Sequence, residues 1–274
     1  MSTVRVYLSG NPVHDRVLEA FYEGCPEEKT LARNFEYEPS DIAVVFGVFK
    51  SKVPQSFPRG RVFSQQRSLR KDVVVLETGY INRGDGINHH FAAGFNGLNG
   101  RADFRNDGMA GDRAGLLNIE MKAPKDGSFI LLCGQVPWDA SVEGSDHIAW
   151  LGEIAANLMR ITRRPIVFRP HPLAKLPPIQ GCFYSEGPLV DYLERAHAVV
   201  TYNSNTGVDA VLAGKHVFAF DEGSMVWEIA NKDVAEIESA KLPDRSQWLN
   251  DIAYAQWTPG EMAEGLAWRH LFRK

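Results

Sequence analysis

The sequence predicts an α/β protein made of two Rossmann-like lobes with a cleft between them. Short, valine-rich apolar runs alternate with segments of helical periodicity, and the alternation begins again after a linker-like stretch at residues 122–128. Strands that alternate with helices form parallel sheets through right-handed crossovers. We therefore expect a first lobe at residues 1–122 and a second lobe at residues 123–244. Terminal helices at 245–274 are expected to pack back across both lobes.

Three runs in the first half are expected to be strands. Residues 3–9, 42–49 and 73–77 are short and apolar, as strands buried on both faces are. Residues 12–24 carry apolar side chains at helical spacing. Residues 78–115 are rich in Gly, Asn, Asp and Arg, and their aromatic side chains argue against disorder. This stretch is expected to be an ordered, functional loop region.

The second half repeats the alternation of strands and helices. The expected strands are residues 129–133, 165–169, 198–202 and 216–220, and the expected helices are residues 146–160, 188–196 and 205–213. The tail is expected to be helical and carries Trp248, Trp257 and Trp268.

Composition narrows the classes of function. A net charge of −4 at pH 7 gives no general attraction to nucleic acid or to anionic membranes, although a local basic patch is compatible with it. Cys25, Cys133 and Cys182 are far apart and odd in number, which predicts neither a disulfide framework nor a zinc site. With no signal peptide and no long apolar run, we expect a cytoplasmic protein without membrane insertion, as a monomer or weak dimer.

The most informative stretch is residues 198–220, in which a β-rich run gives way to a helix-period segment. One of Asn203, Ser204, Asn205 and Thr206 can cap that helix. The free N–H groups of the first turn, with the helix dipole, favour a phosphate. Gly207 is expected to leave room for a ligand near the backbone. An ordinary capped crossover of an α/β protein explains the same pattern without a ligand.

A polar segment comes directly after each of several predicted strands. Ligands of an open parallel sheet bind at these carboxyl ends of the strands. Arg169 suits a diphosphate, and His171 can donate to a phosphate oxygen. A rigid turn with a surface histidine is the alternative. Gln135 and Asp139 come after the expected strand at residues 129–133. They are candidates to hold a ribose, a base or a sugar hydroxyl.

Glu77 is the first candidate for a catalytic residue. It ends an apolar strand, and partial desolvation there would raise its pKa toward that of a useful general base. A solvated glutamate that caps a turn is the alternative, and Asp103 and Asp85 are rival bases. His89 and His90 have no third ligand at a recognisable spacing, so no metal site is predicted.

A basic run in the first half lies within thirteen residues that contain no acid. Such a run is usually a solvated face, and it is also the best candidate in this chain for contact with a nucleic-acid backbone. The predicted acceptor-binding residues are Asn11, His14, Arg59, Arg61, Arg67, Arg70 and Arg101, with Lys71 in the same run.

These motifs resemble the GT-B nucleotide-sugar glycosyltransferases. Arg169-Pro-His-Pro172, followed by the stretch from Thr201 to Phe218, is similar to the pattern with which capsule-polysaccharide transferases hold the donor phosphate. The resemblance covers about residues 129–220. Tyr254-Ala-Gln-Trp-Thr-Pro-Gly-Glu-Met262 also looks like the tail of small phage-borne members of this group.

The resemblance implies sugar transfer, with the donor in the second lobe, the acceptor in the first, and no obligatory metal. It implies UDP-glucose or a similar nucleotide sugar as co-substrate, and hydroxymethylated pyrimidine in phage DNA as acceptor, which would place the protein in the host cytoplasm. A transferase that builds a surface or capsule glycan, or a nucleotide-sugar-binding protein without turnover, is the alternative. The implied donor-binding residues are Gly134, Gln135, Asp139, Arg169, His171, Asn203, Ser204, Asn205, Thr206, Gly207 and Asp209.

Overall fold

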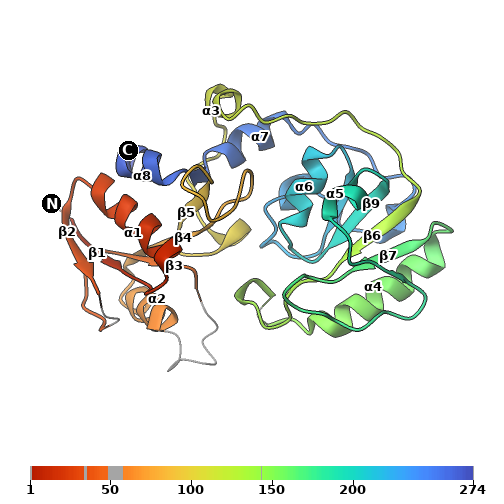
Figure 1. Cartoon of the computed structure of the whole chain (residues 1–274), viewed down its shortest axis with the longest axis horizontal. Helices are drawn as coiled ribbons and strands as arrows, with labels where there is room; N and C mark the ends of the chain where they lie inside the picture. The colour runs from red at the N-terminus through yellow and green to blue at the C-terminus, as the bar shows by residue number, and fades with distance from the viewer. Residues whose placement is uncertain (1, 34–35, 49–57, 143, 274) are drawn as a thin grey trace. The chain divides into compact units, whose positions relative to one another are not determined.

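The computed structural model describes residues 2–33, 36–48, 58–142 and 144–273 (Figure 1). The chain divides into two compact units. Unit 1 comprises Met1–Leu117 and Leu249–Lys274, and unit 2 comprises Asn118–Trp248. The tail from Leu249 onward thus belongs to the same unit as the first half of the chain.

Unit 1 contains a six-stranded sheet in the order β11-β5-β4-β3-β1-β2. Its four strands β1 to β4 are parallel, and β5 and β11 join antiparallel at one edge. The strands are β1 (Thr3–Tyr7), β2 (Glu28–Ala32), β3 (Ile42–Phe46), β4 (Asp72–Thr78), β5 (Phe91–Phe95) and β11 (Gln256–Trp257), and the helices are α1 (Pro12–Gly24), α2 (Pro58–Ser68), α3 (Asp112–Leu116), α8 (Pro259–Ala263) and α9 (Leu266–Leu271).

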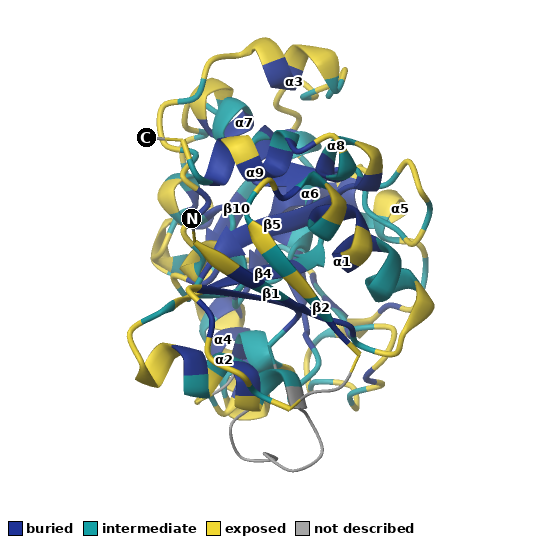
Figure 2. Cartoon of the chain, turned by 90° about the vertical axis from the view of Figure 1, so that its left-hand side faces the viewer, coloured by how far each residue is buried: buried dark blue, intermediate teal, exposed yellow. Residues whose placement is uncertain are grey.

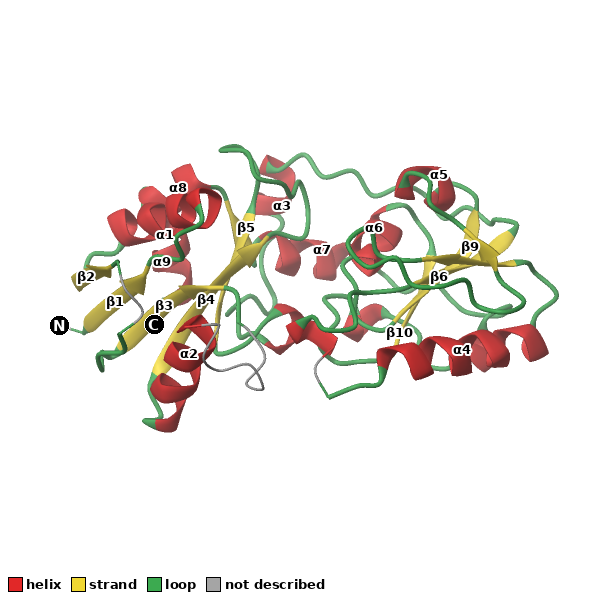
Figure 3. Cartoon of the chain, turned by 60° about the horizontal axis from the view of Figure 1, so that its bottom comes forward, coloured by secondary structure: helices red, strands yellow, loops and turns green. Residues whose placement is uncertain are grey.

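Helices cover both faces of this sheet (Figure 3). Because successive side chains of a strand point to opposite faces, Val44 packs with α1 and the tail, whereas Val45 packs with Val62 of α2. Trp268 of α9 contacts Phe21 of α1, with ring centroids 5.7 Å apart. The tail is therefore part of the core of unit 1. Figure 2 shows the central strands buried and the edge strand β2 partly exposed.

Unit 2 contains a five-stranded parallel sheet in the order β10-β9-β6-β7-β8. Its core is formed by β6 and β9 with the apolar face of α4, including Leu151, Ile154 and Leu158. The strands are β6 (Phe129–Cys133), β7 (Ile166–Arg169), β8 (Phe183–Tyr184), β9 (Ala196–Thr201) and β10 (His216–Ala219), and the helices are α4 (His147–Ile161), α5 (Leu189–Leu193), α6 (Thr206–Leu212) and α7 (Ser246–Ala253), the last of which crosses the boundary between the units.

Some expected elements differ from the structure. The loop region at 78–115 contains a strand, β5, whose small residues conceal it, and Trp257 lies in the short strand β11 instead of a helix. The expected helix at 188–196 is reduced to α5, and β3 ends at Phe46, while residue 49 of the expected strand lies outside the described residues. Among the described residues, no helix is both long and apolar enough to cross a membrane.

Candidate functional site

In unit 1, Glu77 and Arg59 flank one point beside the end of β3. Gly47 lies at this point with a φ of +69°, and a Cβ added to it would lie 3.2 Å from Glu77 Oε2 and 3.5 Å from Arg59 Nη1. The other carboxylate oxygen of Glu77, Oε1, accepts the N–H of Thr78 at 2.9 Å. Glycine adopts this positive φ without the backbone strain that a residue with a side chain would have. It also leaves room for both charged groups.

Arg59 points into this site. Its guanidinium donates to the carbonyl of Phe46, the last residue of β3. Burial lowers the pKa of Arg59, while the nearby carboxylates of Glu77 and Asp15 oppose that shift. Arg59 is thus half-buried beside carboxylates and is not part of an exposed basic face. Its contact with a nucleic-acid backbone stays a prediction.

His14 completes the group that we call the Glu77 cluster (Glu77, Arg59, His14 and Asp15). Its ring stacks on Phe46 with centroids 3.9 Å apart and planes 7° from parallel. Burial lowers the pKa of His14, and the charge of Arg59 lowers it further. Its Nδ1 atom is buried without a hydrogen-bond partner in the described part of the chain. The cluster therefore combines two carboxylates, a guanidinium and an imidazole.

The predicted residue Asn11 and its neighbour Asp15 have structural contacts at the start of α1. The side chain of Asn11 accepts the N–H groups of Val13 and His14 at 2.9 and 3.3 Å, which caps α1. Asp15 accepts from the Ser9 hydroxyl at 2.9 Å. Contact of Asn11 with an acceptor stays a prediction.

Asp103 lies away from the Glu77 cluster. It pairs with Phe95, and Phe95 pairs with Val74 near the start of β4, whereas Glu77 is near the end of β4. Its carboxylate is mostly exposed and forms an ion pair with Arg105 at 3.1 Å. The strand register places Asp103 about three residues, or roughly 10 Å, down the sheet from Glu77, so the two carboxylates do not share one site. A catalytic role for Asp103 stays a prediction.

The basic run is less uniform than its sequence suggests. Acids from other segments reach it, since Arg67 pairs with Asp72 and Lys71 with Asp41, each at 3.4 Å. Arg61, Arg70 and Arg101 are exposed. Two of its cations are therefore paired with acids that lie outside the run, and its contact with a nucleic-acid backbone stays a prediction.

In unit 2, Gln135 and Asn203 bind one another across the ends of β6 and β9. The Gln135 side chain accepts the Asn203 N–H at 2.9 Å and donates to Asn203 Oδ1 at 2.7 Å. Asn203 Nδ2 donates to the Ser141 carbonyl and to Asp221 Oδ1, at 2.6 and 2.8 Å. Because Asn203 is 1% exposed and both its amide hydrogens are used, these two residues hold the loops in place. Their direct contact with a donor stays a prediction.

His147, at the start of α4, supports this Gln135–Asn203 network. Its Nε2 accepts the Gln135 N–H at 3.0 Å, so this nitrogen carries no proton. Burial lowers the pKa of His147 to about 4, which agrees with a neutral ring. Sequence reasoning missed both His147 and Asp221. The signal was weak, since each stands alone in a polar loop or at a helix start.

Backbone N–H groups of the turn at residues 203–207 donate hydrogen bonds to residues of the turn or close to it. The N–H of Ser204 donates to Thr201 Oγ1, and that of Thr206 donates to Ser204 Oγ, at 3.0 and 3.2 Å. The N–H of Gly207 donates to the Ser204 carbonyl at 2.9 Å. The predicted set of free N–H groups is therefore wrong at these three residues. A Cβ on Gly207 would lie 2.9 Å from Val226, so this glycine makes room for packing and not for a ligand.

Arg169 and His171 follow β7 at the same edge of the sheet. Arg169 Nη2 donates to the Gly187 carbonyl at 3.4 Å, while its buried Nε has no partner among the described residues. Burial lowers the pKa of His171, the Asp139 carboxylate opposes this, and the charge of Arg169 adds to it. The charges of Arg169 and Asp139 thus both act on the His171 ring.

Two further predicted residues lie beside this group. Gly134 follows β6, and its N–H donates to the Arg169 carbonyl at 2.9 Å. Burial raises the pKa of Cys133 to about 12, an effect that Arg169 opposes and Asp209 strengthens, so both charges lie near this thiol.

No group of three or more metal-ligating side chains suited to an ion occurs within residues 2–33, 36–48, 58–142 and 144–273. His89 Nδ1 instead accepts the N–H of Gly86 at 2.8 Å.

Comparison with solved structures relates both units to known proteins. KpsC of Thermosulfurimonas dismutans, a β-Kdo 2,7 transferase, is 17% identical with a TM-score of 0.59, over 96% of this chain and 98% of that chain. The β-Kdo 2,4 transferase of the same name and organism is 17% identical with a TM-score of 0.56, over 93% and 90% of the two chains.

The chain has a GT-B-like fold. The predicted α/β class with two Rossmann-like lobes is thereby confirmed. No protein-family model and no curated protein matches the sequence. At 17% identity the GT-B-like fold is what these proteins share, and the cleft and the roles of the two lobes stay predictions.

Proposed function

We propose that the chain is a glycosyltransferase that moves a sugar from a nucleotide-sugar donor to a hydroxyl acceptor. The observation that carries the proposal is the likeness in fold to a KpsC transferase over 96% of this chain. Two features support it. The Glu77 cluster and the group of Arg169, His171 and Asp139 each lie near the carboxyl ends of parallel strands, where α/β proteins bind ligands.

Glu77 is the proposed general base. The oxygen of the acceptor hydroxyl forms a bond to the anomeric carbon of the sugar. The proton of that hydroxyl passes to the Glu77 carboxylate. The bond from that carbon to the nucleotide phosphate breaks, and the electron pair leaves with the phosphate oxygen. Glu77 Oε2 and Arg59 Nη1 both lie beside Gly47, so a guanidinium neighbours the proposed base.

Arg169 and His171 are proposed to bind the donor phosphates. The guanidinium has a buried Nε–H without a partner in the described chain, and a charge-assisted hydrogen bond to a phosphate would satisfy it. UDP-glucose or a similar nucleotide sugar is the proposed donor. Gln135 and Asn203 would keep the surrounding loops in place.

Hydroxymethylated pyrimidine in DNA is the acceptor that we propose first. The supporting observation is that Arg61, Arg70 and Arg101 are exposed in unit 1, which also carries Glu77. A carbohydrate hydroxyl of a surface glycan is the second candidate, because the KpsC proteins that share the fold are Kdo transferases.

The proposal is tested by incubating the protein with a panel of nucleotide sugars and two acceptors, a hydroxymethylcytosine duplex and an oligosaccharide. Mass spectrometry of the acceptors reads the result. A gain of one sugar mass on the duplex supports the first acceptor, and a gain on the oligosaccharide alone supports the second. Tight nucleotide-sugar binding with no gain on either would favour a binding protein without turnover.

A further inference from the structure

The tail motif at residues 254–262 is joined to the strand that carries Glu77. Gln256 in β11 pairs with Ala92 of β5, and Ala92 pairs with Glu77 of β4. Directly opposed residues of antiparallel strands point to the same face. Gln256 and Glu77 therefore lie in one row, two strands apart, with the methyl group of Ala92 between them.

The Gln256 side chain holds the segment that follows Glu77. Its Oε1 accepts the N–H groups of Tyr80 and Ile81, at 2.7 and 2.9 Å. The residue is 0% exposed, so water does not replace it as a partner for these amides. Gly79 lies directly against it, since an added Cβ would be 3.0 Å from Gln256 Oε1. Three residues after Glu77, the chain is thus fixed by one side-chain oxygen from the tail.

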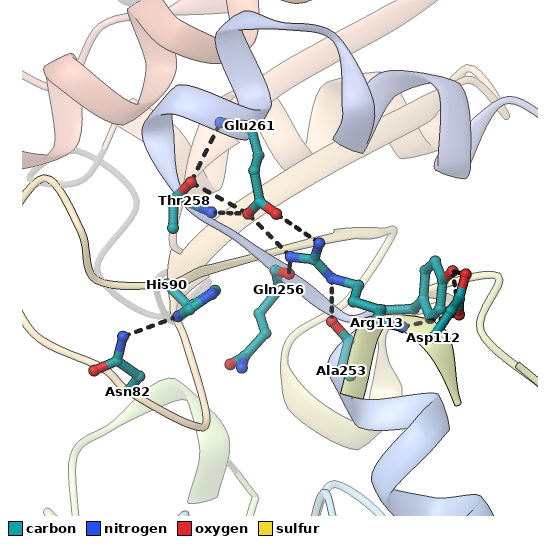
Figure 4. A network of polar contacts seen from close by, with 9 residues as sticks. Asn82, His90, Asp112, Arg113, Ala253, Gln256, Thr258 and Glu261 are labelled. Atoms are coloured by element: carbon teal, nitrogen blue, oxygen red, sulfur yellow. Dashed lines mark hydrogen bonds and ion pairs between the residues drawn. The ribbon is translucent and has the colours of Figure 1, made fainter. Parts of the chain in front are cut away.

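Arg113 in turn fixes Gln256 (Figure 4). Its guanidinium donates to the Gln256 carbonyl at 2.8 Å and to the Ala253 carbonyl at 2.7 Å. It also binds the Glu261 carboxylate at 2.6 and 3.0 Å and lies 3.9 Å from the centre of the Trp257 ring. Both sides of β11 are therefore anchored to one buried cation.

We propose that Gln256 is a positioning residue for Glu77, acting through the amides of Tyr80 and Ile81. The proposal rests on the proposed function of Glu77 as the general base. It gives the tail motif a role in turnover that burial of Trp257 alone would not require. Gln256 lies two strands from Glu77 and is not itself a catalytic residue.

Gln256→Met tests this, because methionine fills a similar volume but offers no comparable acceptor. Gln256→Glu is the conservative variant, since it keeps an acceptor oxygen and loses only an Nε2 that has no partner among the described residues. Gln66→Met is the matched control. Gln66 is equally buried in unit 1, and it donates to the carbonyls of Ser40 and Asp72, at the opposite end of β4.

Hydrogen exchange of residues 78–82 and steady-state kinetics are the two readouts. We expect faster exchange in Gln256→Met and a kcat lower by about 10- to 100-fold, as for misplacement of a catalytic group. The KM for the nucleotide sugar should stay within about twofold, because the donor is bound by unit 2. Gln256→Glu should restore kcat in large part, and Gln66→Met should change neither readout. If Gln256→Met does not fold, Gln256→Asn, whose amide is too short to reach, replaces it.

Unchanged exchange at residues 78–82 overturns the proposal, and so does faster exchange with an unchanged kcat. A kcat loss of equal size in Gln66→Met would also overturn it, since the effect would then be general loosening. If the wild-type protein transfers no sugar, the proposed function fails, and amide exchange at Tyr80 and Ile81 alone decides the positioning claim.

Discussion

At the scale of single residues, Arg169 is the cation on which the proposed donor site should depend most. Arg169→Ala should weaken nucleotide-sugar binding by roughly 1.5–3 kcal/mol, the range for hydrogen bonds to charged groups. Calorimetric titration measures this, with Arg163→Ala, an exposed arginine of the same unit, as the control. Equal affinities of folded Arg169→Ala and wild type would show that the phosphates bind elsewhere.

Glu77 is the residue on which turnover should depend. Glu77→Gln removes the proton acceptor but keeps the shape of the side chain, so kcat should fall by about 10²–10⁴-fold while donor affinity is retained. Asp103→Asn is the comparison, and it should have little effect because Asp103 is exposed and paired with Arg105. Loss of activity in Asp103→Asn alone would show that Asp103, and not Glu77, is the base.

At the scale of elements, the Arg113–Glu261 pair joins α3 to α8. Arg113→Met should lower the free energy of unfolding by about 3–5 kcal/mol, because it leaves a largely buried carboxylate without its partner. The double variant Arg113→Met/Glu261→Met should recover part of this loss. Urea unfolding measures both, and equal stabilities of the single variant and wild type would contradict the buried pair.

The same pair has a defined pH dependence. Burial raises the pKa of Glu261, but the hydrogen bonds and charge of Arg113, together with Thr258, bring it below the ordinary value. For a carboxyl with a lowered folded-state pKa, the stabilisation is present above the unfolded value of about 4.3 and is lost as the pH falls through the folded value.

The lowered pKa of His147 predicts that the stability of unit 2 falls in acid. Its folded-state pKa of about 4 lies below the ordinary 6.5, so the unfolded state binds the proton first as the pH falls. Stability should be full above pH 6.5 and decline toward pH 4, by an amount on the order of 3 kcal/mol. His147→Gln, which does not titrate, should show a smaller decline in urea unfolding than wild type. His89→Gln in unit 1 should decline as wild type does.

The elements differ in how far the sequence reveals them. The buried strand β3, Ile-Ala-Val-Val-Phe, is apolar throughout, which predicts a strand with both faces covered. The edge strand β2, Glu-Lys-Thr-Leu-Ala, and the small-residue strand β5 carry no such signal. β5 exists because β4 and β11 pair with it, and β11 lies more than 150 residues away in the chain. Such long-range pairing leaves no local pattern.

The candidate site shows the same division. The positions of Glu77 and Arg169 at strand ends, and of His171 just after a strand, were predictable from the sequence, and their roles stay predictions. The proximity of Arg59 to Glu77 was not, because a helix and a loop separate them in the chain and only the ends of β3 and β4 bring them together. Periodicity also does not distinguish a polar residue that binds a ligand from one that, like Asn203, binds its neighbours.

At the scale of the whole molecule, the salt dependence of DNA binding tests whether DNA is the acceptor. Each DNA phosphate that the protein neutralises should add about −0.9 to the slope of log affinity against log salt. Replacing the exposed Arg61 by Ala and Arg70 by Asn should flatten this slope by roughly one to two units. Asn suits position 70, where φ is 57°.

The control for this salt experiment replaces Arg160 and Arg163, two exposed arginines of unit 2, by Ala. Its slope should equal that of wild type. Negligible DNA affinity at low salt, or a slope indifferent to Arg61 and Arg70, would favour the carbohydrate acceptor, because a neutral acceptor releases no counterions.

Group transfer itself is the central claim, and the stoichiometry of one reaction tests it most directly. The nucleotide released from the donor and the sugar gained by the acceptor are measured in the same sample, by chromatography and by mass. A transferase releases one nucleotide for each sugar that the acceptor gains, and Glu77→Gln should reduce both amounts together. Nucleotide release without a gain in acceptor mass, or donor binding with neither, would contradict sugar transfer.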